Sequence, residues 1–331
     1  MQKYRFEGSF ERWARASGCA PRLQFRQRSQ LVAQRFLSLF SYVCSMTIHE
    51  ASQQLCFQLF HLYDEREAGN ITDLVMEHIT GWKKIDRIVN KSVPLSAVQA
   101  KTLELYTRAL LDHTPVQYVL HEAWFFDMKL YVDDTVLIPR PETEELVDWM
   151  IRDARNSASG IGSLVLDIGT GSGCIPLAIK KQLPRMNVHS CDISEAALDI
   201  AQKNAADQQL AVHFHRLDIL SADDRDRLPL FDIIISNPPY IPQKDKTTMA
   251  HNVLQYEPAL ALFVADDDAL LFYKAIADFA TTHLNKNGAI YLEIHEDMGA
   301  SLINLYRQRN FSNIELRKDM QGKDRLIRLI N

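Results

Sequence analysis

The stretch that most suggests chemistry is Asn-Pro-Pro-Tyr at residues 237–240, which follows the apolar run F-D-I-I-I-S. That run has the β-branched composition of a strand buried on both faces of a parallel sheet. Two consecutive prolines cannot continue the strand, because neither offers an N–H and each fixes φ. Asn237 and Pro238 therefore present an amide oxygen and a carbonyl oxygen in fixed directions. A planar amide or aromatic amine can donate one hydrogen of its NH₂ group to each oxygen, while Tyr240 stacks on the flat group.

This corner suits the methylation of a nitrogen atom. Two oxygen acceptors can hold a nitrogen in line with a sulfonium methyl group. They also favour the rehybridisation of that nitrogen as it attacks. No general base is needed, because the proton becomes acidic only after the methyl group has arrived. Catalysis of this kind consists mainly of positioning and desolvation. The alternative is a turn without chemical purpose.

A glycine-rich turn in V-L-D-I-G-T-G-S-G indicates where a nucleotide-like ligand would bind. Gly169, Gly171 and Gly173 follow a buried strand and precede a helix, where glycines allow backbone and ligand to approach closely. The dinucleotide pattern is G-x-G-x-x-G, whereas here the third glycine comes one residue early. S-adenosylmethionine, which has no pyrophosphate, is therefore the better candidate, and a tight strand-helix turn is the structural alternative.

Two aspartates at predicted strand ends are candidate ligands for the same cofactor. Asp192 follows the glycines by roughly 20 residues, where a carboxylate can accept hydrogen bonds from both ribose hydroxyls. Asp218 is placed to bind an adenine amino group, and Ile219 to flank the ring. The alternatives are a helix N-cap for Asp192 and an ordinary turn residue for Asp218.

The elements that must position these residues alternate between strand and helix from Gly162 onward. Such alternation predicts a parallel sheet with helices on both faces. The final segment, residues 314–330, is predicted to be an antiparallel hairpin at the sheet edge. The crevice at the carboxyl ends of the strands would then hold both the glycine turn and residues 237–240.

The first half of the chain predicts different elements. Residues 48–113 show the periodicity of short helices, with Ile48, Ala51 and Leu55 among the apolar positions. In residues 123–133, Trp124, Phe126, Met128, Leu130 and Val132 alternate with polar or outward positions, which predicts one half-buried strand. A second short strand is expected at residues 135–138. A helix is expected from Pro141, with acidic residues in its first turn.

Composition and charge exclude several classes of protein. The chain has 331 residues with 47% hydrophobic and 24% charged side chains, which is typical of a globular protein. No apolar run long enough for a membrane span is present. The five cysteines show no metal or disulfide spacing, so we expect packing roles, no bound metal and a reducing compartment.

The first 45 residues carry a net charge of +6, so the remainder of this −5 chain carries −11. Three interpretations of residues 1–45 stay open: translation that begins at Met46, a basic flexible tail, or an organelle-targeting peptide. The strongly acidic remainder disfavours direct nucleic-acid binding.

The order of several motifs resembles the release factor glutamine methyltransferase family, also called HemK or PrmC. They are P-V-Q-Y-V-L, V-L-I-P-R-P-E-T-E, D-I-G-T-G-S-G, S-N-P-P-Y-I-P, Y-E-P-A-L-A-L and K-D-M-Q-G-K-D-R, and they cover about residues 47–331. Asn-Pro-Pro-Tyr alone is shared with enzymes that methylate amino groups of nucleic acids. The V-L-I-P-R-P-E-T-E motif is more specific to the protein-glutamine branch.

The resemblance implies an α/β fold, a Rossmann-like class I S-adenosylmethionine-dependent methyltransferase. After the basic extension (1–45), which is expected to be unstructured or a start-site artefact, the expected domains are a helical substrate-docking domain (46–113), a β-hairpin linker (114–140) and a catalytic domain (141–331). The donor S-adenosyl-L-methionine would be bound by Gly169, Thr170, Gly171, Ser172, Gly173, Asp192, Asp218, Ile219 and Asn237.

The implied substrate is the glutamine of the Gly-Gly-Gln tip of class 1 peptide chain release factors. It would be held by Asn237, Pro238, Pro239 and Tyr240, of which Asn237, Pro238 and Tyr240 would be catalytic. A role in translation termination, as a cytoplasmic monomer, follows; the protein would be organellar if residues 1–45 are a targeting peptide. His121 and Ala259 depart from the glycine and arginine common in the family, and the role of Arg140 stays open.

Two other functions compete with this one. Methylation of an exocyclic amine of DNA or RNA would need a basic groove, which the charge of −11 disfavours. The other is a nucleotide-binding module or an NAD-dependent oxidoreductase, which the absence of the dinucleotide glycine spacing and the presence of Asn-Pro-Pro-Tyr disfavour.

Overall fold

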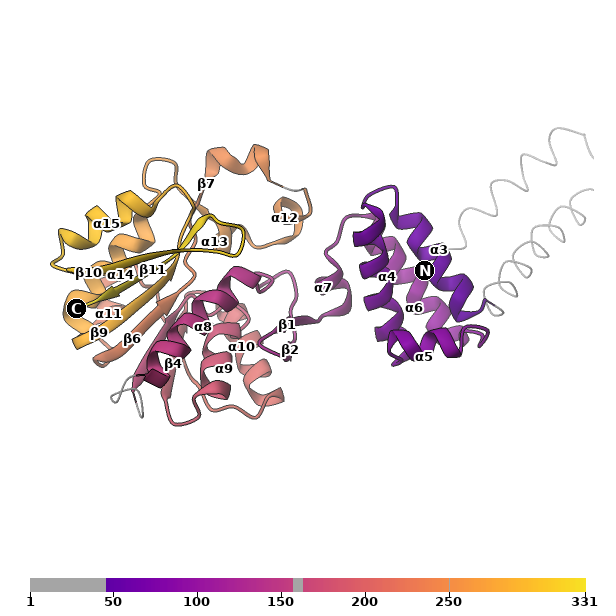
Figure 1. Cartoon of the computed structure of the whole chain (residues 1–331), viewed down its shortest axis with the longest axis horizontal. Coiled ribbons are helices and arrows are strands. Elements are labelled where there is room, and N and C mark those ends of the chain that lie inside the picture. Colours follow the sequence, from indigo (N-terminus) through magenta and orange to yellow (C-terminus); the bar gives the residue numbers. More distant parts are fainter. Residues whose placement is uncertain (1–45, 157–162, 250) are drawn as a thin grey trace, which may run out of the picture. The chain divides into compact units, whose positions relative to one another are not determined.

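The computed structural model describes residues 46–156, 163–249 and 251–331. The chain divides into one compact unit that ends at Arg108 and a second that runs from Ala109 to Asn331 (Figure 1). The three interpretations of residues 1–45 concern a segment outside the described residues. No helix in the described part of the chain is long and apolar enough to cross a membrane.

The first unit consists of helices, as the periodicity predicted. They are α3 (Ile48–Leu59), α4 (Glu65–Thr80), α5 (Lys84–Val89) and α6 (Ala97–Leu111), and the last three residues of α6 belong to the second unit. α3 begins with a capping box, in which Glu50 N–H donates to Thr47 Oγ1 (3.2 Å) and Thr47 N–H donates to Glu50 Oε2 (2.9 Å). Ile48, Ala51 and Leu55 are buried, so the expected apolar face of this helix is the one that packs.

The second unit is built on a seven-stranded sheet. Its strands are β3 (Leu164–Ile168), β4 (Asn187–Asp192), β5 (His213–Arg216), β6 (Phe231–Ser236), β9 (Leu284–Glu293), β10 (Asn313–Lys318) and β11 (Asp324–Ile330). They lie in the order β10-β11-β9-β6-β3-β4-β5, parallel from β9 to β5. β10 and β11 form an antiparallel hairpin at the edge, as expected. The predicted parallel α/β sheet with an antiparallel hairpin at its edge is therefore confirmed.

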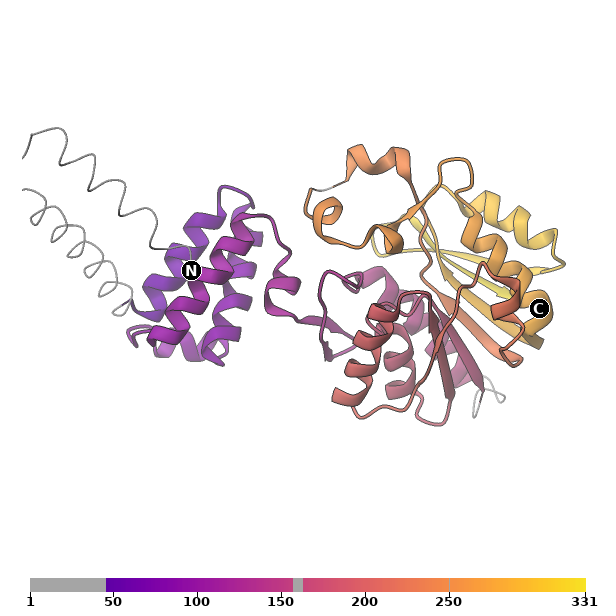
Figure 2. The same ribbon diagram turned by 180° about the vertical axis from the view of Figure 1, so that it is seen from behind.

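Helices cover both faces of this sheet (Figures 1 and 2). Those named here are α8 (Pro141–Asn156), α9 (Cys174–Gln182), α10 (Glu195–Asp207), α11 (Ala222–Arg225), α14 (Leu271–His283) and α15 (Gly299–Arg307). In β6, Ile233 and Ile235 pack into a core with α8 and α9, whereas Ile234 packs into the opposite core with α14 and α15. This period of two explains why all three isoleucines are apolar.

A partly buried carboxylate, Asp232, fixes the amino-terminal edge of the parallel strands. Asp232 of β6 accepts the Leu164 N–H of β3 at 2.8 Å and the side-chain amide of Asn285 in β9, also at 2.8 Å. Ladder hydrogen bonds set the strand spacing. The Asp232 carboxylate thus adds a side-chain hydrogen bond from β6 to each of its neighbours, β3 and β9.

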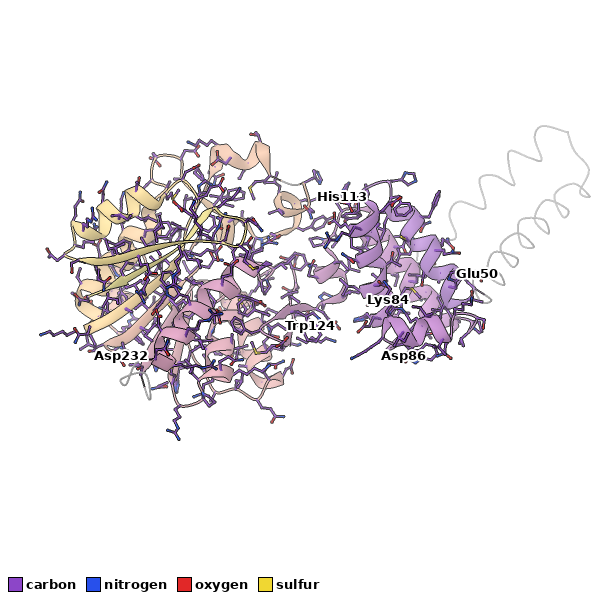
Figure 3. All side chains as sticks on the ribbon, viewed as in Figure 1. Glu50, Lys84, Asp86, His113, Trp124 and Asp232 are labelled. Carbon is purple, nitrogen blue, oxygen red and sulfur yellow. The ribbon has the colours of Figure 1, made fainter. Side chains whose placement is uncertain are left out.

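The expectation of a single strand over residues 123–133 is wrong. The chain forms β1 (Ala123–Phe125) and β2 (Met128–Leu130), an antiparallel hairpin whose turn residues Phe126 and Asp127 have positive φ. Because the turn reverses the chain, Phe125 rather than Trp124 is buried, and Trp124 is 62% exposed (Figure 3). Residues 135–138, expected to be a strand, instead form a turn and an irregular segment.

The second unit contains two further segments outside the seven-stranded sheet and its covering helices. α7 (Val116–Leu120) precedes the β1–β2 hairpin, and residues 241–264 hold β7 (Ile241–Pro242), η1 (Gln243–Thr248), α12 (His251–Tyr256), α13 (Ala259–Leu262) and β8 (Phe263–Val264). β7 and β8 pair in parallel. Residues 241–264 thus form an excursion that begins directly after the Asn-Pro-Pro-Tyr corner.

The order of the strands places a crevice between β3 and β6. The chain passes from β3 outward to β4 and β5, and then returns to β6 on the other side of β3. Ile168 and Ser236, the last residues of β3 and β6, are register partners, and Ser236 Oγ donates to the Ile168 carbonyl at 2.6 Å. Ligands of open α/β sheets bind at such a switch point. The glycine turn and residue 237 therefore begin side by side.

Candidate active site

A cavity of about 170 Å³ lies at the carboxyl ends of β3, β4, β5 and β6. Its lining comes from the four strand ends, from the starts of α10 and α14, and from two covering segments, one before α8 and the other around α13. The lining residues are Thr135, Val136, Leu137, Ile168, Gly169, Gly171, Cys191, Asp192, Ile193, Ser194, Ala197, Leu217, Asp218, Ile219, Ser236, Asn237, Pro238, Pro239, Pro258, Leu260, Ala261 and Phe272. We call this the donor cavity.

The three glycines of the turn play two different roles. Gly169, Gly171 and Gly173 all have positive φ, at 81°, 52° and 82°, which explains the residue type. A Cβ added at Gly169 or Gly171 would meet no described atom within 4 Å, so the space before them is open to a ligand. A Cβ at Gly173 would lie 3.1 Å from the Ala201 Cβ. Gly173 therefore serves the packing of the turn on α10.

Asp192 fastens the glycine turn and faces the donor cavity. Its Oδ2 accepts the Gly171 N–H at 3.0 Å, and its Oδ1 accepts the Ser194 N–H at 2.9 Å. The N-cap of α10 is Ser194, whose hydroxyl accepts the Ala197 N–H. Asp192 is thus not the N-cap. Each carboxylate oxygen keeps a lone pair for a further donor, and burial raises the pKa of Asp192.

The remaining predicted donor residues divide into two groups. Asp218 and Ile219 line the cavity, and Asp218 Oδ1 also accepts the Leu220 N–H at 2.9 Å, so it is a turn residue as well. Thr170 and Ser172 are not among the lining residues. Their side chains are buried at 3% and 1% exposure, beneath the turn. Any contact of theirs with a ligand would have to come from the backbone.

Asp167 is a buried carboxylate directly behind the turn. Ser190 Oγ donates to its Oδ2 at 2.6 Å, and its Oδ1 has no hydrogen-bond partner in the described structure. Burial raises the pKa of Asp167 to about 7. The region behind the glycine turn therefore holds a titratable group.

A second cavity of about 170 Å³ adjoins the donor cavity and shares four lining residues with it, namely Leu137, Asn237, Pro238 and Ala261. Its other lining residues are Arg140, Tyr240, Ile241, Met249, Val253, Leu262 and Glu293. We call it the acceptor cavity. Its walls are mostly aliphatic, and it meets the donor cavity at the corner that the sequence singled out.

Hydrogen bonds fix the side chains of this corner. Asn237 Nδ2 donates to Thr143 Oγ1 at 3.0 Å, and Thr143 Oγ1 donates to Glu293 Oε2 at 2.6 Å. Tyr240 Oη donates to the other oxygen of the same carboxylate, Glu293 Oε1, at 3.1 Å. The Asn237 amide NH₂ is therefore engaged inside the protein. Its Oδ1 is left for a ligand.

Comparison with known proteins decides the family. Residues 50–120 match the PrmC N-terminal domain and residues 151–261 match the methyltransferase small domain. A protein of Flavobacterium psychrophilum named release factor glutamine methyltransferase is 39% identical over 284 residues, which are 86% of this chain and 99% of that protein. The chain belongs to the release factor glutamine methyltransferase family.

Other similarities accompany this one. A release factor glutamine methyltransferase of Bacteroides thetaiotaomicron is 38% identical over 266 residues, 80% of this chain and 94% of its own. Among solved structures, a methyltransferase from Pyrococcus furiosus is 18% identical and covers 62% of this chain and 89% of its own, with a TM-score of 0.43. The resemblance inferred from the motifs is confirmed.

One departure from the release factor glutamine methyltransferase pattern has a structural reason. His121 follows α7 with a φ of 53°, a left-handed conformation that glycine adopts without strain. Its ring stacks on Tyr131 with centroids 5.2 Å apart, and its Nδ1 lies 3.2 Å from the Val132 carbonyl. Ala259 is exposed at the start of α13 and lines neither cavity.

The sequence did not single out Thr143, Glu293, Leu137 or Ala261. Thr143 and Leu137 lie inside the V-L-I-P-R-P-E-T-E motif that marks this methyltransferase family, and Ala261 lies in Y-E-P-A-L-A-L. A carboxylate at the end of an otherwise apolar strand, as in G-A-I-Y-L-E-I, is the signal that indicates Glu293. Leu137 and Ala261 carry no such signal, because apolar residues in loops are common.

Proposed function

We propose that the chain transfers a methyl group from S-adenosyl-L-methionine to the side-chain amide nitrogen of the glutamine in the Gly-Gly-Gln tip of class 1 peptide chain release factors. The observation that carries the proposal is the junction of the two cavities. Asn237 and Pro238 line both of them, so an acceptor nitrogen at this corner adjoins the donor. Relatives that the chain covers almost completely are named release factor glutamine methyltransferases.

The donor cavity fits S-adenosylmethionine in its chemistry. Gly169 and Gly171 leave open space in which a ligand can approach the backbone. Asp192 offers lone pairs to the ribose hydroxyls, and Leu217 and Ile219 supply apolar contacts for a purine. When bound, S-adenosylmethionine supplies an electrophilic methyl group on a sulfonium. We assign donor binding to Gly169, Gly171, Asp192, Asp218 and Ile219, with backbone contributions from residues 170, 172 and 173.

The acceptor cavity suits a glutamine side chain. Asn237 Oδ1 and the Pro238 carbonyl accept the two amide hydrogens, which holds the nitrogen with its lone pair toward the donor cavity. Aliphatic walls and Tyr240 exclude water and contact the methylene groups and the flat amide. Pro239 lines the donor cavity rather than the acceptor cavity, so its contribution is to fix the corner. Rate enhancement then comes from positioning and desolvation.

The three parts of the chain after residue 45 have different roles in this proposed function. We propose that the helical domain of residues 46–113 docks the release factor, with residues 114–140 as the linker to the catalytic domain of residues 141–331. We further propose that the enzyme acts as a cytoplasmic monomer, or as an organellar one if residues 1–45 are a targeting peptide. Its partner is the release factor, and neither a metal nor nucleic acid takes part.

Methyl transfer to a purified class 1 release factor tests this function. We expect the mass of one methyl group to be added to the Gly-Gly-Gln peptide, identified by fragmentation, in a reaction that requires S-adenosylmethionine. A release factor with that glutamine replaced by alanine should gain no label. Transfer RNA and plasmid DNA serve as parallel acceptors. Labelling of these, with none of the release factor, would contradict the proposal.

A further inference from the structure

One buried carboxylate receives hydrogen bonds from both sides of the acceptor corner. Glu293 ends β9 and is 2% exposed, Thr143 lies in the first turn of α8 and is also 2% exposed, and 150 positions separate them in the chain. Glu293 Oε2 accepts from Thr143, and Glu293 Oε1 accepts from Tyr240. Glu293 thus lines the acceptor cavity and is bonded to Tyr240, which lines it too, and to Thr143, which holds Asn237.

The number of hydrogens on Thr143 fixes the direction of the chain of bonds. A threonine hydroxyl has one hydrogen and two lone pairs. That hydrogen is donated to the Glu293 carboxylate, so Thr143 Oγ1 can only accept from Asn237. Asn237 must therefore turn its NH₂ group toward Thr143. A protonated Glu293 or a missing hydroxyl would remove this constraint.

We infer that Thr143 and Glu293 are positioning residues which select the productive orientation of the Asn237 amide and so make the site an acceptor of NH₂ hydrogens. This inference rests on the proposed function and deepens it. If the amide were turned by 180°, its NH₂ would face the NH₂ of the substrate, and two donors would oppose each other in a cavity with mostly aliphatic walls. The hydrogen bond from the Thr143 hydroxyl to the Glu293 carboxylate is charge-assisted and therefore strong. It keeps the Thr143 hydrogen away from Asn237 and so selects the orientation of the Asn237 amide.

The charge on Glu293 depends on several surrounding groups. Burial raises the pKa of its carboxyl group, whereas the hydroxyls of Thr143 and Tyr240 and the charge of Arg325 favour the anion. Glu142 disfavours the anion. Two hydroxyl donors on one carboxylate are consistent with the ionised form, since an ionised carboxylate is a pure acceptor.

A pair of substitutions at Thr143 separates the hydroxyl from the shape. Thr143→Val keeps the volume and removes the hydroxyl, whereas Thr143→Ser keeps the hydroxyl. We expect single-turnover methylation of the release factor to fall about ten- to a hundredfold in Thr143→Val and by less than about threefold in Thr143→Ser, with donor affinity unchanged in both. The matched control is Thr72→Val, at a buried threonine of α4 whose hydroxyl has no hydrogen-bond partner in the described structure. It should retain the wild-type rate.

Reversal of the hydrogen-bond chain provides a sharper test. In Asn237→Asp, two carboxylates compete for the single Thr143 hydrogen, so we expect a loss of about a hundredfold or more. Adding Glu293→Gln supplies an N–H that donates to Thr143 Oγ1 and frees the Thr143 hydrogen for the carboxylate introduced at position 237. The double variant should therefore be at least about tenfold faster than Asn237→Asp, although Glu293→Gln alone slows the wild type.

The outcomes distinguish this inference from the proposed function. If the wild-type chain leaves the release factor unmethylated, the function fails. The inference alone fails in two cases in which the wild type is active. In the first, Thr143→Val and Thr143→Ser have the same methylation rate. In the second, the fold losses of rate caused by Asn237→Asp and Glu293→Gln multiply in the double variant. Calorimetric donor affinity and the melting temperature of each variant identify those that have lost the fold. The inference is supported if all variants are folded and the double variant is faster than Asn237→Asp.

Discussion

Arg140 and Glu257 are separated by 117 positions in the chain, yet Arg140 Nη2 lies 2.5 Å from Glu257 Oε1 and 2.6 Å from Oε2. Arg140 stands immediately before α8 and lines the acceptor cavity, whereas Glu257 immediately precedes Pro258 of the donor cavity. The Glu257 side chain is 2% exposed and the Arg140 side chain 34%. This ion pair therefore joins the two segments that cover the cavities, which supports the ordering role for Arg140.

Removal of the arginine should cost stability because it leaves a buried charge unpaired. We expect Arg140→Met to lower the free energy of unfolding by about 1–3 kcal/mol, less than for a fully buried pair because Arg140 is about one third exposed. Urea unfolding measures this change. Arg140→Met combined with Glu257→Gln should be more stable than Arg140→Met alone. A double variant that is the less stable of the two would contradict the assignment of the cost to the unpaired carboxylate.

Donor binding and acceptor positioning should be separable by two substitutions. Asp192→Ala removes a carboxylate that faces the donor cavity and fastens Gly171, so we expect affinity for S-adenosylmethionine to fall roughly ten- to a hundredfold. Asn237→Ala should bind the donor nearly normally and transfer the methyl group about a hundredfold more slowly. Calorimetry and single-turnover methylation are the measurements. Unchanged donor affinity in Asp192→Ala would exclude its assignment.

How much the sequence could predict depended on whether the signal was local. The parallel sheet, the glycine turn and the corner at residues 237–240 follow from residue types that only one local structure accommodates, such as consecutive prolines or glycines with positive φ. Asp192 lines the cavity because its position at a strand end fixes it there. Thr170 and Ser172 belong to the glycine motif by position, and only the packing reveals that their side chains lie beneath the turn.

The failures have a common physical cause. The alternation of Trp124 and Phe126 fits a single strand, but a two-residue turn at Phe126 and Asp127 shifts the inward face by one residue. Neither turn residue is glycine or asparagine, so the usual hairpin signal is missing. The Thr143–Glu293 contact spans 150 positions, and nothing local in either segment indicates its partner.

Two glycines of the same turn should respond differently to alanine. Both substitutions force a left-handed conformation on alanine, at a cost of about 1–2 kcal/mol. In Gly171→Ala the new Cβ projects into open space, so donor affinity should fall about tenfold. In Gly173→Ala the Cβ lies 3.1 Å from the Ala201 Cβ and 3.3 Å from Leu177 Cδ1, which adds an overpacking cost and should make this variant the less stable.

Melting temperature and donor calorimetry on both variants decide the point. Gly169→Ala is the matched comparison, because its Cβ also meets no described atom within 4 Å. It should behave like Gly171→Ala. If Gly173→Ala is the most stable of the three, then the packing of the turn on α10 does not explain the third glycine.

The buried carboxyl group of Asp167 should make stability depend on pH. Its pKa is raised from an ordinary 3.8 to about 7, chiefly by burial, so between these pH values the folded protein binds more protons than the unfolded chain. The stabilising contribution of Asp167 to the free energy of unfolding is present in full below about pH 4 and is lost as the pH rises through about 7. The complete loss amounts to roughly 4 kcal/mol, since one pKa unit is about 1.4 kcal/mol.

Asp167→Asn isolates this contribution, because asparagine resembles the protonated acid and can still accept from Ser190. We expect the ligand-free variant and the wild type to have similar stability near about pH 4.5, and the variant to be the more stable by a few kcal/mol at about pH 8. Asp192, Glu257 and Glu293 also have raised pKa values, so the difference between the two proteins is the informative quantity. Parallel stability curves for the two proteins across this pH range would mean that Asp167 remains ionised in the folded state.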